Sequence, residues 1–288
     1  MTVDFTGVAF TVFGVPIYWY GIMYLVAISA GWWLGRYRIR KYPQWGWSAQ
    51  QMDDLVFYAA LGIILGGRIG YLLFYDLGRL LDEPTLFAML KRIVAIRDGG
   101  MSFHGGLLGV MFACWLFARK QGWAYFKVMD FIAPLVPLGL GAGRIGNFIN
   151  GELWGKPTDL PWGMIFKKAN DGLLRHPNPL YEAFLEGLVL FVVLWWFSSR
   201  PRPRMAVAGM FAVLYSVFRF GIEFVRMPDA HLGYLAFDWL TMGHLLTLPL
   251  LALGIWLIWK AYSRPVYDTA GDPGDEKGGR NRGKGRGA

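Results

Sequence analysis

The sequence is poor in cysteine and in charge. Cys114 is the only cysteine among 288 residues, so the chain cannot form an internal disulfide. Charged residues make up 17% and hydrophobic residues 55% of the chain, which excludes an ordinary soluble globular domain. The N-terminal stretch MTVDFTGVAF lacks a basic segment and an obvious cleavage site, so we predict no removable signal peptide.

Recognisable nucleotide, nucleophile and metal motifs are missing as well. The chain has no P-loop and no G-x-S-x-G elbow, which argues against an ATPase and a serine lipase. His, Cys and acidic residues do not occur in pairs with metal-ligand spacing, so we expect no metal and no cofactor. The net charge of +9 is compatible with a nucleic-acid partner, but the positions of the basic residues argue against one.

Long apolar runs are what the sequence does contain. A helix needs roughly 20 apolar residues to cross a hydrocarbon layer of about 30 Å. Seven segments are candidates: 18–36, 54–75, 101–118, 129–149, 181–198, 206–226 and 240–260. We therefore predict an all-α membrane protein with seven transmembrane helices. Residues 1–264 are expected to form a single integral membrane domain, and the low-complexity basic residues 265–288 a disordered tail.

The basic residues indicate the orientation of these spans. If the spans alternate, most of the 29 Lys and Arg lie on one side, after spans one, three, five and seven. They are Arg36, Arg38, Arg40, Lys41, Arg119, Lys120, Lys127, Arg200, Arg202, Arg204, Lys260, Arg264, Lys277, Arg280, Arg282, Lys284 and Arg286. The positive-inside rule places this side in the cytoplasm, with the N-terminus outside and the C-terminus inside.

The connections on the outer side are the more elaborate ones. Residues 86–97 follow helical spacing, which indicates either an amphipathic arm helix in the outer interface or an ordinary packed loop helix. Residues 151–178 carry several Pro and Gly and are expected to form a small outward cap. Residues 5–20 are aromatic and β-branched, which is typical of an interfacial hairpin or a re-entrant segment.

The stretch from Gly139 to Gly155 changes character within the membrane. It contains six glycines, one arginine, two asparagines and one glutamate in seventeen residues. An arginine inside a bilayer costs about 2.5–3.5 kcal/mol on insertion scales unless an anion compensates it. Arg144 among glycines therefore indicates a binding site for an anion. The alternative is a helix end with a snorkelling arginine and small residues for helix packing.

Other polar residues fall at the same depth of their predicted spans. Ionisable groups inside spans usually face the bundle interior or a watery cavity, so we predict one outward-facing cationic chamber whose obvious ligand is a phospholipid head group. Glu152 and Glu223 are expected to balance part of its charge, with Glu223 the salt-bridge partner of Arg219 four residues earlier. Arg226 can instead snorkel at the interface, and His104 can be a polar residue at a helix start. The chamber is predicted to include Tyr20, Arg68, His104, Arg144, Asn147, Glu152, Tyr215, Arg219, Glu223 and Arg226.

At these residues the chain resembles the bacterial prolipoprotein diacylglyceryl transferase family. The run GRIGNFINGE at 143–152 is similar to the family signature. Further similar blocks are WYGIMYL at 19–25, GGRIGYLLFY at 66–75, DGGMSFHGGL at 98–107, RHPNPLYEAFLEG at 175–187, FRFGIEFVRMPD at 218–229 and TMG at 241–243. They occur in order from the first span to the seventh, which makes the resemblance far more specific than a single motif.

The resemblance implies a seven-span fold in the bacterial inner membrane with the site toward the periplasm. It also implies an activity, transfer of the diacylglyceryl group of phosphatidylglycerol to the lipobox cysteine of a preprolipoprotein, which forms a thioether and releases glycerol phosphate. By motif, the essential residues are His104, Arg144 and Arg219, supported by Tyr20, Asn147, Glu152, Gly155 and Tyr215. We expect Arg68, Glu223 and Arg226 to contribute to substrate binding.

Several points stay open at this stage. The thiol proton can pass to His104, or positive surroundings can raise the thiolate fraction without a base. Cys114 lies midway through a span and is expected to be a packing residue. Competing functions are a lipid-binding transporter or channel, and another lipid-modifying transferase with the same head-group site. Transporters commonly show inverted repeats, whereas here only LGGRIG at 65–70 and GAGRIG at 141–146 resemble each other.

Overall fold

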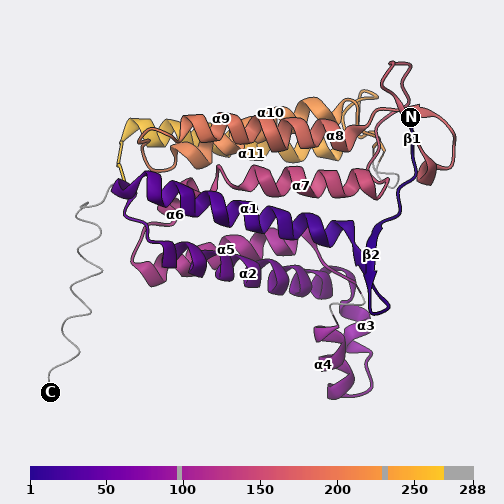
Figure 1. The fold of residues 1–288 in the computed structure, drawn as a ribbon, viewed down its shortest axis with the longest axis horizontal. Helices are drawn as coiled ribbons and strands as arrows, with labels where there is room; N and C mark the ends of the chain where they lie inside the picture. Colours follow the sequence, from indigo (N-terminus) through magenta and orange to yellow (C-terminus); the bar gives the residue numbers. More distant parts are fainter. Residues whose placement is uncertain (96–98, 229–232, 269–288) are drawn as a thin grey trace. The chain divides into compact units, whose positions relative to one another are not determined.

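The computed structural model describes residues 1–95, 99–228 and 233–268 (Figure 1). The chain divides into two compact units. Unit 1 contains Met1–Arg38 and Met129–Asp268, and unit 2 contains the described residues Ile39–Val128. The predicted tail beyond residue 268 and Arg97 of the predicted arm helix lie outside the described residues.

Helices occur at all seven predicted spans (Figure 1). They are α1 (Trp19–Lys41), α2 (Ala49–Tyr75), α5 (Phe103–Gln121), α6 (Tyr125–Ile132) with α7 (Val136–Ile149), α8 (Asn178–Glu182) with η4 (Ala183–Val189) and α9 (Leu190–Phe197), α10 (Ala206–Glu223), and α11 (Met242–Ser263). Among the described residues, α2, the α8–α9 run, α10 and α11 are long and apolar enough to cross a membrane, and α6 with α7, bent by 50°, can form a fifth span.

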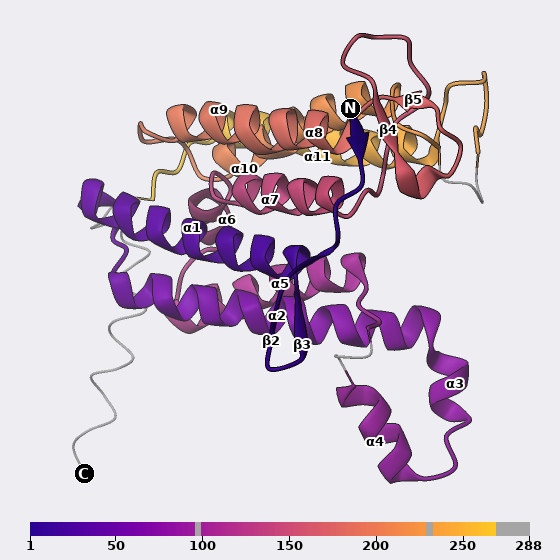
Figure 2. The same cartoon turned by 45° about the vertical axis from the view of Figure 1, so that its right-hand side comes forward.

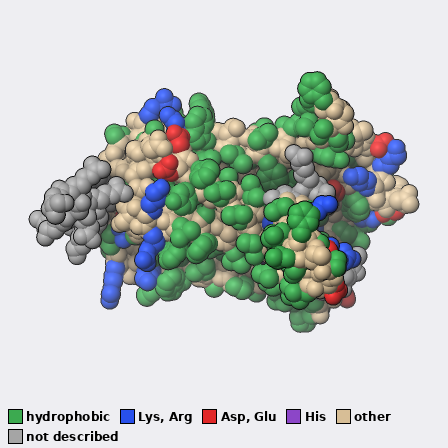
Figure 3. Space-filling model, turned by 90° about the horizontal axis from the view of Figure 1, so that it is seen from below, with side chains coloured by type: hydrophobic (Ala, Val, Ile, Leu, Met, Phe, Trp, Pro, Cys, Tyr) green, Lys and Arg blue, Asp and Glu red, His purple; other side chains and the backbone are tan. Residues whose placement is uncertain are grey.

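The structure therefore supports a largely helical membrane protein with four or five apolar spans, and the count of seven stays a prediction. The two remaining helices have mixed compositions. α1 contains three Trp and three Tyr and ends with a basic turn that includes Arg38, Arg40 and Lys41, and the first turn of α5 contains His104 and two glycines. Figure 3 shows many hydrophobic side chains exposed on one face, as expected where helices contact lipid rather than water.

In unit 1, α10 packs against α11, α9 and α8. Asp130 of α6 accepts hydrogen bonds from the backbone N–H groups of Met205 (2.6 Å) and Ala208 (2.8 Å), and so caps the N-terminus of α10 from another helix. Deeper in the unit, Leu190 and Leu194 of α9 pack with Ala133 and Val207 in a buried cluster. α10 also packs along the length of α11. These contacts fix the helix that carries Arg219.

Small strands complete unit 1. β2 (Val8–Val12) and β3 (Val15–Tyr18) form an antiparallel hairpin, which identifies the aromatic segment before α1 as a hairpin. β1 (Thr2–Val3) pairs in parallel with β4 (Met164–Phe166), and β4 pairs antiparallel with β5 (Leu174–Arg175) (Figure 2). β4, β5 and η3 (Lys167–Ala169) belong to the segment predicted as a cap, so this segment is an ordered part of unit 1.

Unit 2 is built on close contact between α2 and α5. Glycines at spacing four on α2 (Gly62, Gly66 and Gly70) face Gly105 and Gly109 of α5. A Cβ on Gly70 would lie 2.7 Å from the Gly105 Cα, so larger residues would separate the backbones. Small residues at this spacing are the usual basis of helix packing in membranes. Gly66 and Gly70 of the GGRIG run therefore serve helix packing.

The chain segment that connects α2 to α5 forms an arm of unit 2, which we define as α3 (Leu77–Leu81) and α4 (Leu86–Val94). α4 confirms the helix predicted at 86–97. Arg92 of α4 pairs with the buried Asp76 (2.7 Å) and with Glu83 (2.8 Å). Leu86, Phe87 and Val94 are exposed. An amphipathic helix with an exposed apolar side suits a membrane interface, and this location stays a prediction.

Candidate functional site

The candidate site of unit 1 begins with Arg144 on α7. Its Nε lies 3.0 Å from Glu182 Oε2, and its Nη2 lies 3.7 Å from Glu186 Oε2. Both glutamate side chains are fully buried, whereas the Arg144 side chain is 21% exposed. Because a buried carboxylate requires a cation, the two glutamates account for the position of Arg144 in the fold. Its open side remains accessible to a further anion.

A local departure from the α-helix positions these two carboxylates. Residues 183–189 form a π-helical turn between α8 and α9, a form that is rare and frequently found at functional sites. Gly187 in this turn contacts Gly141 of α7, and a Cβ on Gly187 would lie 2.7 Å from the Gly141 Cα. This close approach of two backbones lets Glu182 and Glu186 reach the arginine on α7.

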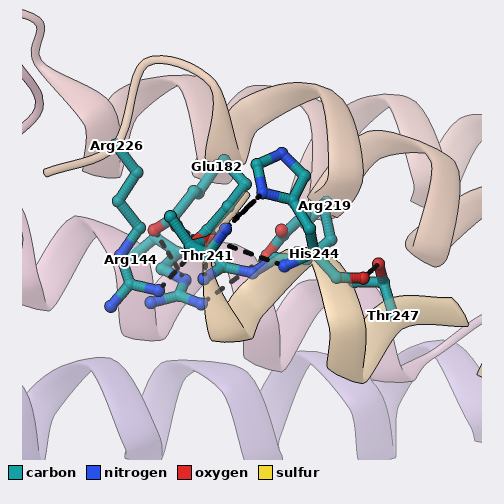
Figure 4. A network of polar contacts seen from close by, with 9 residues as sticks. Arg144, Glu182, Arg219, Arg226, Thr241, His244 and Thr247 are labelled. Atoms are coloured by element: carbon teal, nitrogen blue, oxygen red, sulfur yellow. Dashed lines mark hydrogen bonds and ion pairs between the residues drawn. The ribbon is translucent and has the colours of Figure 1, made fainter. Parts of the chain in front are cut away.

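Glu182 also joins Arg144 to a second arginine, Arg219 of α10 (Figure 4). The Nη1 of Arg219 donates to Glu182 Oε1 at 2.5 Å, so one carboxylate accepts from guanidinium groups on two helices. The Nη2 of Arg219 lies 2.8 Å from Glu223 Oε2. The i,i+4 pair predicted between Arg219 and Glu223 is therefore confirmed. Arg226 lies 3.7 Å from the same Glu223 oxygen, so it takes part in the network rather than snorkelling away.

The network continues into the first turn of α11. Thr241 Oγ1 donates to Glu223 Oε1 at 2.8 Å and lies 3.1 Å from Nδ1 of His244. Thr247, further along α11, donates to the His244 backbone carbonyl at 2.7 Å. Figure 4 shows Arg144 and Arg226 at one end of this chain of contacts, Glu182 between the ends, and His244 and Thr247 at the other end.

Charges in this network are matched. Arg144, Arg219 and Arg226 face Glu182, Glu186 and Glu223. Internal pairing keeps the buried arginines compensated, and it orients their planar groups before any ligand binds. Guanidinium groups held in this way suit a phosphate, which accepts two hydrogen bonds from each fork. Among the described residues no group of three or more His, Cys, Asp or Glu is placed to hold a metal ion.

The other predicted site residues of unit 1 differ in their burial and packing. Tyr20 lies against Gly146, where an added Cβ would be 2.9 Å from its ring, so α1 packs on α7 at this point. Asn147 is buried beside it, and Tyr215 stacks on Phe211 one turn below Arg219. Glu152, in contrast, is exposed. Glu182 and Glu186 pair with Arg144, and the expected contribution of Glu152 to the charge balance stays a prediction.

Gly155 lies where the cap meets α10. Its N–H donates to the His176 carbonyl at 2.9 Å, and its carbonyl accepts from Arg175 Nη1 at 3.1 Å. Lys156 N–H donates to the Val225 carbonyl at 2.9 Å. A bond from Arg175 to Asp171 lowers the pKa of that carboxyl, and burial lowers the pKa of His176. Gly155 thus has a packing function, and its predicted role in substrate binding stays a prediction.

Two predicted site residues, Arg68 and His104, belong to unit 2. Arg68 of α2 is buried, and it donates to the carbonyls of Ile93, Gly99 and Gly100 at 2.9 Å each, and to that of Arg92. Its guanidinium therefore holds the connection between α4 and α5, which is a structural role. His104 is exposed in the first turn of α5. Its neighbour Gly105 packs on α2 rather than providing open space.

Five members of the network were not predicted from the sequence: Glu182, Glu186, Thr241, His244 and Thr247. A signal for the glutamates was present, because two carboxylates at spacing four in an apolar span require partners. Thr241 and His244 form a capping box, a signal that precedes many helices.

Comparisons with known proteins agree with this architecture. A family model described as prolipoprotein diacylglyceryl transferase matches residues 7–260. Among curated relatives, the phosphatidylglycerol–prolipoprotein diacylglyceryl transferase of Ectopseudomonas mendocina is 56% identical over 88% of this chain and 93% of its own length. Proteins of the same name from Azotobacter vinelandii and Pseudomonas fluorescens are 57% and 53% identical, over 86% and 90% of this chain and 91% and 94% of their own lengths.

Proposed function

Because the chain belongs to the prolipoprotein diacylglyceryl transferase family, we propose that Arg144 and Arg219 hold the phosphate of phosphatidylglycerol during diacylglyceryl transfer. The chain is a membrane transferase, and it moves the diacylglyceryl group of phosphatidylglycerol to a prolipoprotein in the first step of lipoprotein maturation. The acceptor is the thiol of a lipobox cysteine, and the reaction takes place at the periplasmic side of the inner membrane.

The observation that carries the phosphate role is the shared carboxylate. Arg144 Nε lies 3.0 Å from Glu182 Oε2, and Arg219 Nη1 lies 2.5 Å from Glu182 Oε1. Two guanidinium groups from separate helices therefore already point at one carboxylate. Arg144 is the more exposed of the two, at 21% against 10%, and is therefore the first contact for an incoming phosphate. Glu182 keeps both forks oriented while the lipid binds on their open side.

The chemistry follows from these charges. The substrate sulfur attacks the glycerol carbon that bears the phosphate ester, the C–S bond forms, and the C–O bond to the phosphate breaks. The phosphate oxygen leaves with its electron pair and gains negative charge, which the arginines stabilise. Fixed charges aimed at a developing anion usually contribute the largest catalytic effect. The thiol proton passes to His104, or the thiol ionises without a base beside the guanidinium groups.

The test uses purified protein with phosphatidylglycerol and a lipobox peptide, and mass spectrometry of the peptide. Wild-type protein should add one diacylglyceryl group to the cysteine. R144A and R219A should lower turnover by about 10²–10³-fold or more. R144K and R219K keep the charge but lose the two-point fork, so they should also be strongly impaired. R79A removes an arginine with an exposed side chain on α3 and should retain turnover.

Near-normal turnover in R144K or R219K, with the protein folded, would remove that residue from the phosphate role. Lipid movement without peptide product would contradict the transferase assignment. H104Q separates the two routes for the thiol proton. If H104Q loses turnover at neutral pH and regains it at raised pH, His104 is the base, and the thiol ionises by itself only when the pH is high. If H104Q has wild-type turnover at every pH, His104 is not the base.

A further inference from the structure

His244 occupies an unusual position at the start of α11. Its side chain is fully buried, and its ring centroid lies 4.7 Å from those of Phe220 and Phe224 and 5.3 Å from that of Trp239. The Nε2 atom is buried and has no hydrogen-bond partner among the described residues. Burying an unpaired polar atom costs free energy. We therefore expect the hydrogen bonds of the other ring nitrogen, Nδ1, to offset this cost.

The contacts of Nδ1 define the form of the ring. The backbone N–H of Thr241 donates to His244 Nδ1 at 3.2 Å. Nδ1 must therefore carry a lone pair, and in the neutral ring the proton lies on Nε2, facing the aromatic rings. Thr241 is the N-cap of α11 and His244 its third residue, so the two side chains form a capping box. The ring thus fixes the backbone of Thr241.

Thr241 in turn fixes Glu223. The hydroxyl has a single proton, which it donates to Glu223 Oε1 at 2.8 Å. The carboxylate lies flat against the first turn of α11, because a Cβ on Gly243 would be 2.7 Å from Glu223 Oε2 and closer still to Oε1. A helix N-terminus favours a carboxylate in this place. Glu223 Oε2 in turn pairs with two arginines: it lies 2.8 Å from Arg219 Nη2 and 3.7 Å from Arg226 Nη1.

We propose that His244 is a positioning residue, which acts through Thr241 and Glu223 to direct the guanidinium groups of Arg219 and Arg226 toward the lipid phosphate. His244 itself does not touch the substrate. The TMGH run at 241–244 provides each part of this device: a hydroxyl, a residue without a side chain beside the carboxylate, and an acceptor for the cap. The inference rests on the proposed phosphate role of Arg219.

The test compares substitutions of His244 that differ in one property. H244F fills the aromatic enclosure but lacks an acceptor for the Thr241 N–H. H244Q restores an acceptor, since glutamine is a standard third residue of a capping box. T241V removes the hydroxyl and T241S retains it. S263A serves as a control on the same helix, because the Ser263 hydroxyl donates to the Trp259 backbone carbonyl and lies outside the network.

We expect H244F and T241V each to raise the KM for phosphatidylglycerol on the order of tenfold, with the KM for the lipobox peptide unchanged. H244Q and T241S should restore the lipid KM to within about threefold, and S263A should match wild type. The double variant H244F/T241V should be no worse than the poorer single variant, because both act through Glu223. A wild-type lipid KM in folded H244F would overturn the proposal, as would equal increases in both KM values.

A second measurement does not depend on turnover. In protein labelled with ¹⁵N-histidine, the His244 signal, identified by its loss in H244Q, should show the tautomer with the proton on Nε2. The opposite tautomer or a charged ring would overturn the proposal. If this tautomer is found but wild-type protein forms no product from phosphatidylglycerol, the proposed function fails while the link from His244 to Glu223 holds.

Discussion

Gly155 shows how one missing side chain joins two parts of unit 1. An added Cβ would lie 2.6 Å from the His176 Cβ, 2.7 Å from the Val225 carbonyl oxygen and 2.9 Å from the His176 carbonyl oxygen. Two of these neighbours are backbone atoms, which cannot turn aside as a flexible side chain can. The bridge between Gly155 and Arg226 connects the cap directly to the residues that follow α10.

We therefore expect G155A to lower the free energy of unfolding by about 1–3 kcal/mol, the usual effect of overpacking. Thermal unfolding in detergent measures it. G221A is the matched control, because a Cβ on Gly221 of α10 meets no atom within 4 Å and alanine favours a helix. If Gly155 instead acts only in substrate binding, G155A will raise the lipid KM at unchanged stability, which would contradict the packing role.

Charge pairs within one helix could be predicted at the residue scale, and pairs between helices could not. Arg219 and Glu223 are four residues apart, so helical geometry alone brings them together. Arg144 and Glu182 lie on different helices, and no spacing rule in a single sequence pairs them. For the same reason Arg68 was expected near a ligand, although its donors bond the carbonyls of a connection that only the fold brings to it.

At the scale of elements, an ionic cluster connects α4 of the arm to the end of α2, in addition to the bonds from Arg68. Arg92 of α4 bonds both carboxylate oxygens of Asp76, at 2.7 and 3.0 Å, and Glu83 at 2.8 Å. These bonds from Arg92 lower the pKa of the Asp76 carboxyl below its usual 3.8. A carboxyl whose pKa is lowered in the folded protein stabilises the fold at every pH above its usual pKa. This stabilisation is lost as the pH falls through the lowered pKa.

The arm should therefore loosen in acid. We expect a spin label at K91C, an exposed position of α4, in a C114A background, to stay restrained from neutral pH down to about pH 4 and to become mobile below it. D76N removes the charge and should give a mobile label at every pH. A label in D76N that is as restrained as in the parent protein would show that the arm does not depend on the pair between Arg92 and Asp76.

The sequence predicted where helices and strands occur better than it predicted their local geometry. The hairpin before α1, the helix at 86–94 and the helices at all seven candidate spans follow from apolar periodicity and aromatic content. The π-helical turn at 183–189 does not, because the residues AFLEGLV have the pattern of an ordinary helix, and the turn packs against Gly141 of another helix. The two glycines that permit this contact lie 46 residues apart in the chain, so their pairing is a tertiary property.

For the whole molecule, the open question is how many helices cross the membrane. The described residues contain four spans by length and hydropathy, or five with α6 and α7 combined. α1 and α5 are long enough, with 23 and 19 residues at about 1.5 Å rise each, but they are less apolar. Buried polar residues and glycines lower the hydropathy of a helix that faces other helices, so composition alone underestimates spans in a bundle.

We predict that both helices cross. Single cysteines in a C114A background, tested with a membrane-impermeant thiol reagent on intact spheroplasts, resolve each crossing separately. T6C, K91C and K168C should react from outside, whereas Q44C and K120C should react only after the membrane is opened. Matching reactivity of T6C and Q44C would show that α1 does not cross, and matching reactivity of K91C and K120C would show the same for α5. Because each pair brackets one helix, an error in one span cannot be hidden by an error in the other.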